Sequence, residues 1–382
     1  MFKLSAENYN NTLKTMAVIR GVRPNVISFY ENFEKINIRF IAGSFKPFKY
    51  KSKKKNFEFI NLSYYKFFKF DPAGVINQFG NLSWINLVGL EKHLVGCDII
   101  NISDTYYFPH LQVVSWARKH EIPLVTIVWT TIPNHITSWF PPYSYITKKV
   151  VEATELFILR SKSALAFTDS LKIPRKKVRV IYKGIDLDKF KTSTINHKPS
   201  SLKILFTGNL SRAKGLDDLI FCYLSLVTMY PKLKLVIAGD GEMKPYVEGL
   251  NKRGLVDYRG FVDYEKLPKL YQEADIFCAP SKFRKLLGVK VWEEYFSYAL
   301  MEALASGLPI VATASGGIPE EVGKDNILVE PGNRKELKRA LVKLIEDESL
   351  RKSISLRNRR RAETLFDAKK QARKTEGAIM RL

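Results

Sequence analysis

Short apolar runs alternate with longer amphipathic runs along the whole chain, and this alternation predicts parallel α/β sheets. In the first half, the apolar runs predict strands near residues 16–20, 38–42, 57–62, 98–102, 124–129, 165–168 and 178–182. The amphipathic runs between them predict helices near 26–35, 72–94, 109–119 and 146–159. Strands joined through helices in this order are typical of a doubly wound sheet with helices on both faces.

The second half repeats the alternation after the polar segment KTSTINHKPSS. Its apolar runs predict strands near 202–206, 233–238, 258–261, 275–280 and 308–312. Helices are expected from the turn at 207–215 to about 229, and near 264–272, 335–346, 350–363 and 367–380. We therefore expect an N-terminal domain at residues 1–185, a linker at 186–200, a second domain at 201–365 and a last helical segment at 366–382.

Two carboxylates bracket the start of another short predicted helix. Glu294 precedes this helix and Glu302 lies within it, so the two can serve different parts of one ligand. The backbone N–H groups of Ser297, Tyr298 and Ala299 head the helix and form a site for an anion such as a diphosphate. A solvated helix end would explain the two glutamates equally well if they stood alone.

The turn after the first strand of the second half carries two basic residues. Its sequence, GNLSRAKG, places Arg212 and Lys214 at a strand-to-helix junction. The helix dipole favours an anion at that point, which makes this turn a candidate diphosphate site. The alternative for Lys214 is a surface lysine at the start of a helix.

Composition adds a strong positive charge to this picture. The 382 residues carry a formal net charge of +24, which favours anionic partners: nucleotide diphosphates, nucleic acid or an anionic membrane surface. The three cysteines have neither metal-site nor disulfide spacing, so we expect a reduced, cytosolic chain. No apolar run is long enough for a membrane span, and the N-terminus lacks the apolar core of a signal peptide.

The segment that contains the two glutamates resembles the donor-binding segment of retaining GT-B glycosyltransferases of family 4. The residues that carry this resemblance are Glu294, Phe296, Glu302, Ala303, Gly307, Pro309, Val311, Ala312, Gly316, Gly317 and Glu320. The segment YKGIDLDKF also resembles the family's inter-domain crossing, at Gly184, Ile185, Asp186 and Phe190. The resemblance implies the GT-B fold, in which two Rossmann-like domains face a central cleft and the final helix packs back on the N-terminal, acceptor-binding domain.

The resemblance also implies roles for single residues. Glu294 is expected to hold the donor sugar and Glu302 the ribose hydroxyls, since a carboxylate accepts two hydroxyl hydrogen bonds. Lys214 matches the lysine that contacts the diphosphate, whereas Asn209 stands where the family has an arginine, and Arg212 is a candidate for the missing charge. The other expected donor-binding residues are Phe261, Phe296, Ser297, Tyr298 and Ala299. Tyr295 and Ser297 stand where other residues are common in the family, and both could reshape the sugar pocket.

The first domain matches the family less well. The family often has a Gly-Gly loop after its first strand, but here the segment from Arg20 to Asn25 contains one glycine. Asp104, His110 and His135 lie near strand exits, where sites collect in parallel sheets. A lone polar residue at such a place is more often a cap than a catalytic group.

These features favour a retaining glycosyltransferase that moves a hexose from a UDP-, GDP- or ADP-sugar to a hydroxyl acceptor, with no metal or cofactor. The acceptor is expected to be a lipid-linked saccharide or glycan precursor. The alternatives are another GT-B enzyme, such as a sugar-nucleotide epimerase or a phosphorylase, and a basic nucleic-acid-binding protein. For a nucleic-acid-binding protein, the sequence lacks zinc-ligand spacing, an RNA-recognition motif and a single basic recognition helix, so we expect no nucleic-acid partner.

A basic and aromatic stretch at 45–70 suggests where the protein docks. It holds eight lysines, one acidic residue and ten aromatic residues. Lysines attract anionic lipids and aromatic rings can lie among headgroups, so we expect peripheral binding to the inner face of the cell membrane. The alternative is that Phe57, Phe59 and Phe67 face the core and the lysines are merely solvated.

Overall fold

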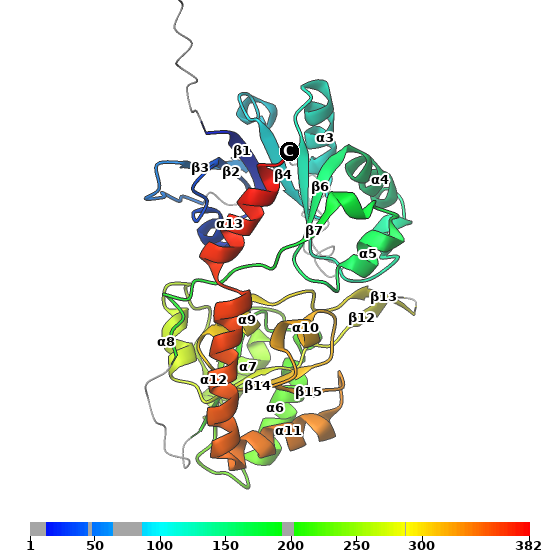
Figure 1. Ribbon diagram of the computed structural model, residues 1–382. Coiled ribbons are helices and arrows are strands. Elements are labelled where there is room, and N and C mark those ends of the chain that lie inside the picture. The colour runs from blue at the N-terminus through cyan, green and yellow to red at the C-terminus, as the bar shows by residue number, and fades with distance from the viewer. Residues whose placement is uncertain (1–12, 45–47, 64–85, 193–201, 287) are drawn as a thin grey trace, which may run out of the picture.

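The computed structural model describes residues 13–44, 48–63, 86–192, 202–286 and 288–382, which form two domains around two parallel sheets (Figure 1). The seven strands of the first sheet are ordered β3-β2-β1-β4-β5-β6-β7, and the six of the second β10-β9-β8-β11-β14-β15. All neighbouring strands in both sheets pair in parallel. The predicted fold class of two doubly wound parallel sheets is therefore confirmed.

The strands of the first sheet are β1 (Thr15–Gly21), β2 (Asn37–Ser44), β3 (Phe57–Ser63), β4 (Ile99–Ser103), β5 (Leu124–Val128), β6 (Thr154–Leu159) and β7 (Val178–Val180). Those of the second are β8 (Lys203–Thr207), β9 (Lys234–Ala238), β10 (Asp257–Tyr258), β11 (Ile276–Ala279), β14 (Ile310–Thr313) and β15 (Ile327–Val329). An antiparallel hairpin, β12 (Arg284–Leu286) and β13 (Val289–Trp292), stands apart from both sheets. Helices on both faces bury the central strands completely, which explains their continuous apolar runs.

The helices of the first domain are α1 (Pro24–Tyr30), α3 (Pro109–Lys119), α4 (Tyr143–Ala153) and α5 (Leu165–Ser170), with short 3-10 turns at η2 (Glu91–His93), η3 (Ile136–Ser138) and η4 (Arg175–Lys177). Those of the second half are η6 (Arg212–Lys214), α6 (Leu216–Leu226), α7 (Lys244–Lys252), α8 (Leu267–Gln272), α9 (Tyr298–Ala305), α10 (Ile318–Val322), α11 (Arg334–Glu346), α12 (Glu348–Leu365) and α13 (Ala368–Ile379). Neither α7 nor the hairpin was predicted from the apolar pattern.

Three predictions in the first domain need correction. The predicted helix at 146–159 ends at Ala153, and its last part is the buried strand β6. The predicted strand at 165–168 is the helix α5 instead. Short apolar runs do not distinguish a buried strand from a helix turn, which is the cause of both errors. Of the predicted helix at 72–94, residues 72–85 lie outside the described residues, and 86–94 contain only η2.

The chain crosses between the two domains twice, side by side. Ile185 on the first crossing and Asp367 on the second form a parallel bridge, supported by the 2.7 Å bond from the Ile185 N–H to the Phe366 carbonyl. At Gly184, a Cβ atom would lie 2.4 Å from the Cα of Ala368, so only glycine allows this approach. Figure 1 shows α12 along the second domain and α13 against the first, where α13 packs on α1.

Candidate functional site

The carboxyl ends of the strands in both sheets meet at the domain interface. The order of strands reverses between β1 and β4 in the first sheet and between β8 and β11 in the second, and ligands bind at such switch points. The Thr131 hydroxyl, just after β5, donates a 2.6 Å hydrogen bond to Glu293 of the second domain. The backbone N–H groups of Lys162 and Ser163, after β6, donate to the Glu320 carboxylate at 2.6 and 2.9 Å. Loops at the carboxyl ends of the two sheets therefore contact each other across the interface.

The turn between β8 and α6 is fixed by close backbone contacts. Gly215 has a φ of +70°, and a Cβ atom there would lie 1.9 Å from the Pro280 carbonyl oxygen at the end of β11. The Ser211 hydroxyl accepts a 3.3 Å hydrogen bond from the Lys214 N–H and caps η6. These contacts place Lys214 at the switch point of the second sheet.

Lys214 and Glu294 form an ion pair, although 80 residues separate them in the sequence. Glu294 is 7% exposed and also accepts a 3.3 Å hydrogen bond from the Ser281 hydroxyl. The Lys214 ammonium lies 5.2 Å from the centre of the Trp292 ring. The structure therefore brings together the two residues that the sequence assigned to the diphosphate and the donor sugar.

The loop that carries Glu294 rests on the Gly316–Gly317 turn. A Cβ atom on Gly316 would lie 2.2 Å from the Glu294 carbonyl oxygen, and one on Gly317 would lie 1.9 Å from that of Tyr295. The Gly317 N–H donates to the Glu294 carbonyl at 2.8 Å. The two glycines thus let the backbones approach closely enough to hold Glu294 in position.

Glu302 is buried inside the second domain. It is 4% exposed and accepts a 2.8 Å hydrogen bond from the Tyr271 hydroxyl, which lies 2.6 Å from the Thr207 hydroxyl at the end of β8. Burial raises the pKa of Glu302 to about 7, against the lowering effects of the Tyr271 hydrogen bond and the Lys183 charge. Its carboxyl group therefore has a hydrogen-bond donor within the second domain.

The start of α9 is less open than the sequence predicted. The N–H of Ser297 already donates to the Glu321 carboxylate at 2.8 Å, so it is not free for an anion. Glu321 is fully buried, and this burial raises its pKa well above the usual range. The N–H groups of Tyr298 and Ala299 remain at the first turn of the helix, where no intrahelical acceptor is available.

Two predicted donor-binding side chains do not join this cluster. Phe296 is 6% exposed and belongs to the apolar core, with its ring 6.0 Å from that of Tyr182. Phe261 lies beyond β10 and is 76% exposed. A donor-binding role for either residue stays a prediction.

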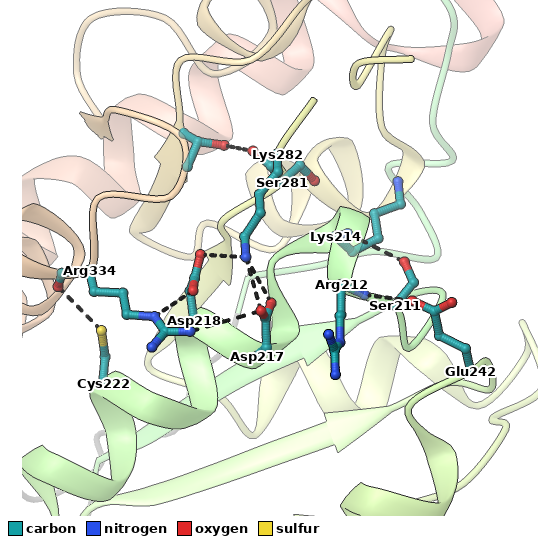
Figure 2. A network of polar contacts seen from close by, with 11 residues as sticks. Ser211, Arg212, Lys214, Asp217, Asp218, Cys222, Glu242, Ser281, Lys282 and Arg334 are labelled. Atoms are coloured by element: carbon teal, nitrogen blue, oxygen red, sulfur yellow. Dashed lines mark hydrogen bonds and ion pairs between the residues drawn. The ribbon is translucent and has the colours of Figure 1, made fainter. Parts of the chain in front are cut away.

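Arg212 points away from the Lys214–Glu294 pair. Its guanidinium group is exposed and extends in the opposite direction from the Lys214 ammonium (Figure 2). Asn209, in the same turn, is also exposed and carries no charge. That Arg212 supplies the charge absent at Asn209 stays a prediction.

A charged network next to Lys214 was not predicted from the sequence (Figure 2). Lys282 forms ion pairs with Asp217 and Asp218 at 3.0 and 2.8 Å, and Arg334 pairs with Asp218 at 2.6 Å. The backbone N–H of Lys282 donates to the Ala213 carbonyl at 2.8 Å. This network fixes the η6 turn next to Lys214.

The polar residues at the strand exits of the first domain serve mainly as structural groups. Asp104 has a φ of +57° and accepts a 3.0 Å bond from the Trp129 N–H, and burial raises its pKa to about 6. Burial lowers the pKa of His110 to about 3. The Nδ1 atom of His135 accepts from the Thr137 N–H, so its Nε2–H donates at 3.0 Å to the carbonyl of Val291 in the hairpin.

Within the described ranges, no cluster of three histidine, cysteine, aspartate or glutamate side chains could hold a metal ion. Among the same residues, no helix is both long and apolar enough to cross a membrane.

Comparison with known proteins gives the same picture for both domains. A family model described as "Glycosyltransferase Family 4" matches residues 37–189, and one described as "Glycosyl transferases group 1" matches residues 188–361. An uncharacterized glycosyltransferase of Methanocaldococcus jannaschii is 32% identical over 295 residues, which cover 71% of this chain and 70% of that protein. Spore coat protein SA of Bacillus subtilis is 27% identical over 218 residues, which cover 50% of this chain and 55% of that protein.

A solved structure supports the architecture. The Anabaena protein HepE, in complex with UDP, superposes with a TM-score of 0.70 at 17% identity, covering 97% of this chain and all of that chain. At this identity the likeness concerns the fold alone, and it confirms the predicted GT-B arrangement.

Proposed function

The chain belongs to glycosyltransferase family 4, and from this membership we propose that it moves a hexose to a hydroxyl of a lipid-linked saccharide or glycan precursor at the membrane. The enzyme takes the sugar from a nucleotide sugar donor, as the family does. The observation that supports the site best is the Lys214–Glu294 ion pair at the carboxyl end of β8, with Glu302 on the adjacent helix.

In the proposed reaction, the bond between the sugar C1 and the diphosphate oxygen breaks while the acceptor oxygen bonds to C1 on the same face. The acceptor proton passes to an oxygen of the departing diphosphate. Lys214 and the first-turn N–H groups of α9 stabilise the negative charge that develops there. Glu294 orients the sugar hydroxyls, and Glu302 accepts the ribose hydroxyls in place of Tyr271.

The donor nucleotide can be identified by a thermal-shift panel with UDP, GDP, ADP and their sugars. UDP is the first ligand to test, because HepE binds it in the solved structure. A ligand at 100 times its dissociation constant should stabilise the fold by about 2.7 kcal/mol. Release of the nucleotide from the sugar that binds then measures turnover, with retention read from the anomeric configuration of the product. If no nucleotide or nucleotide sugar shifts the melting temperature, the proposal is wrong.

The same experiment separates the alternatives. An epimerase changes the sugar and requires no hydroxyl acceptor for turnover, whereas a transferase forms a new glycosidic bond. A nucleic-acid-binding protein would be stabilised by an oligonucleotide and not by a nucleotide sugar. If an oligonucleotide alone raises the melting temperature, the protein is a nucleic-acid-binding protein.

Membrane docking is the second part of the proposal. Within the stretch at 45–70, residues 45–47 and 64–70 lie outside the described residues. The rings of Phe48, Tyr50, Phe57 and Phe59 pack on one another at the edge of the first core, where Phe57 is buried and the other three are half-buried. The exposed charged side chains of the described part are five lysines and one carboxylate: Lys49, Lys51, Lys53, Lys54, Lys55 and Glu58. Docking on the inner face of the cell membrane therefore rests on charge in this part of the stretch.

Vesicle co-sedimentation tests this docking. Wild-type protein should bind vesicles that contain anionic lipid, and binding should fall as salt rises, because lysines near such a surface contribute about 1 kcal/mol each before screening. Replacing Lys51, Lys53, Lys54 and Lys55 with serine should reduce binding. A matched control replaces four exposed lysines of the second domain: Lys232, Lys252, Lys335 and Lys343. Equal binding by both quadruple variants would place docking elsewhere.

A further inference from the structure

Lys282, just after β11, holds the turn that carries Lys214 (Figure 2). Its backbone N–H donates to the Ala213 carbonyl at 2.8 Å, and Ala213 precedes Lys214 in η6. Its ammonium donates to Asp217 at 3.0 and 3.1 Å and lies 2.8 Å from the Asp218 carboxylate. Both aspartates belong to the first turn of α6, so one residue holds the chain on both sides of Lys214.

The residue before Lys282 contacts the other half of the ion pair. Ser281 is 3% exposed, and its hydroxyl donates to Glu294 at 3.3 Å. The Ser281 carbonyl accepts a hydrogen bond from the Thr313 hydroxyl at the end of β14, which fixes this segment to the sheet. The segment therefore joins the turn that carries Lys214 to the carboxylate with which Lys214 pairs.

The Lys282 ammonium balances two adjacent negative charges. Asp217 and Asp218 are neighbours in the sequence, and like charges at this separation repel each other unless cations balance them. Asp218 is 3% exposed, and a buried carboxylate that loses its partner is strongly destabilising. Arg334 lies 2.6 Å from Asp218 but 3.9 Å from Asp217. Among the ion pairs of the described residues, Asp217 would keep only this longer contact if the Lys282 ammonium were removed.

Arg334 shares the aspartates with Lys282 but does not hold the turn. Its guanidinium lies 4.4 Å from the centre of the Phe221 ring, and its carbonyl accepts from the Cys222 thiol at 3.3 Å. These contacts join the start of α11 to α6 (Figure 2). In the described part of the chain, no hydrogen bond or ion pair joins Arg334 to residues 211–214. Arg334 is therefore a matched control for Lys282.

We propose that Lys282 is a positioning residue for the sugar transfer, because it holds η6 in the conformation from which Lys214 reaches the departing diphosphate. The inference rests on the proposed function, in which Lys214 stabilises that leaving group. When Lys214 turns from Glu294 to a phosphate oxygen, the ion pair no longer restrains the turn. The contacts from Lys282 to Ala213 and to the aspartates do not depend on that pair. Holding the turn matters because a misplacement of about 1 Å can lower a rate on the order of 100-fold.

The first experiment compares nucleotide release from the donor sugar by the wild type and three variants: Lys282→Met, Lys282→Arg and Arg334→Met. Lys282→Met should lower kcat about tenfold and change KM by less than about threefold, because Lys282 acts through a group that works in the transition state. Lys282→Arg keeps the cation and should recover most of the rate, whereas Arg334→Met should turn over nearly as the wild type does. Melting curves show that each variant is folded. Equal losses of kcat in Lys282→Met and Arg334→Met would mean that the network only stabilises the fold, and the proposal would be wrong.

A double-mutant cycle tests whether Lys282 acts through Lys214. If it does, adding Lys282→Met to Lys214→Ala should not lower kcat further, because the group that Lys282 positions is already absent. A further loss of about tenfold in the double variant would show that Lys282 acts independently of Lys214 and would overturn the proposal.

Amide hydrogen exchange of residues 208–216, followed by mass spectrometry, requires no turnover. Exchange should be faster in Lys282→Met than in the wild type and unchanged in Arg334→Met, because only Lys282 holds the turn. Should Lys282→Met fail to fold, Asp217→Asn removes a half-buried partner of Lys282 and should give the same faster exchange. Unchanged exchange in the folded variant that removes this contact would contradict the inference. A wild type that releases no nucleotide from any donor contradicts the proposed function, and exchange still tests how far the turn depends on Lys282.

Discussion

The two sides of the cleft differ in how their charges are balanced. In the second domain, Lys214 is paired with Glu294, and Glu302 has Tyr271 as a hydrogen-bond donor. In the first domain, Arg20 and Arg23 have no ion-pair partner within the described ranges. A preformed pair can exchange one partner for a ligand, whereas water and counterions balance an exposed cation such as Arg23. The second domain therefore holds its site charges in a defined arrangement, and the first domain gives Arg20 and Arg23 no fixed anionic partner among the described residues.

The largest expected effect follows from removing the paired cation of the second domain. Lys214→Ala should lower turnover by roughly 100-fold or more, the scale observed when one preorganised donor to a developing anion is lost. The measurement is release of nucleotide from the donor at saturating substrate. Lys214→Arg keeps the charge and serves as the matched control. Turnover within a few-fold of wild type in Lys214→Ala would exclude Lys214 from the stabilisation of the leaving group.

Replacing each of the two glutamates of the second domain should impair a different step of the reaction. Glu302→Ala removes hydrogen bonds to the ribose, so affinity for the bare nucleotide should fall about tenfold or more. Glu294→Ala should leave that affinity nearly intact and lower turnover, because Glu294 is assigned to the sugar. Calorimetry with the nucleotide and initial rates with its sugar separate the two effects. Equal losses of bare-nucleotide affinity would contradict this division.

The sequence predicts the second domain better than the first for a physical reason. Glu294, Glu302 and the glycines at 316 and 317 lie in one continuous segment, so their spacing alone indicates a shared site. Lys183 and Phe296 are 113 residues apart and meet only through the crossing between the domains. No local pattern marks such a contact, so the sequence could not predict it.

The same reasoning applies to the fold. The alternation of apolar and amphipathic runs predicted most strands, because parallel strands are buried on both faces. It failed at 146–159 and 165–168, where short apolar runs suit a strand and a helix equally. Similarly, the N–H of Ser297 was expected to be free, but it is occupied by Glu321, which lies on another helix.

A smaller effect concerns the acidity of Glu302. Burial raises its folded-state pKa from 4.5 to about 7. The folded protein thus holds this proton more tightly than the unfolded chain, so the contribution of Glu302 to stability is full below about pH 4.5 and is lost as pH rises through about 7. As pH rises across this window, the unfolding free energy of the wild type should fall relative to that of Glu302→Gln, by at most about 1.4 kcal/mol per pH unit. Urea denaturation of both proteins at several pH values measures it, and parallel pH profiles would show that Glu302 titrates normally.

The smallest effect is expected at Arg212, and it tests whether Arg212 supplies the positive charge that Asn209 lacks. Its guanidinium group extends into solvent away from Lys214 (Figure 2), and exposed charges contribute only about 0.2–1 kcal/mol to an interaction. Arg212→Ala should therefore lower diphosphate affinity by at most about fivefold, less than Lys214→Ala. Asn209→Arg, in the same turn, adds a cation next to the site and should strengthen diphosphate binding. A loss in Arg212→Ala as large as that in Lys214→Ala would mean that the turn rearranges on binding and that the second domain alone supplies both charges.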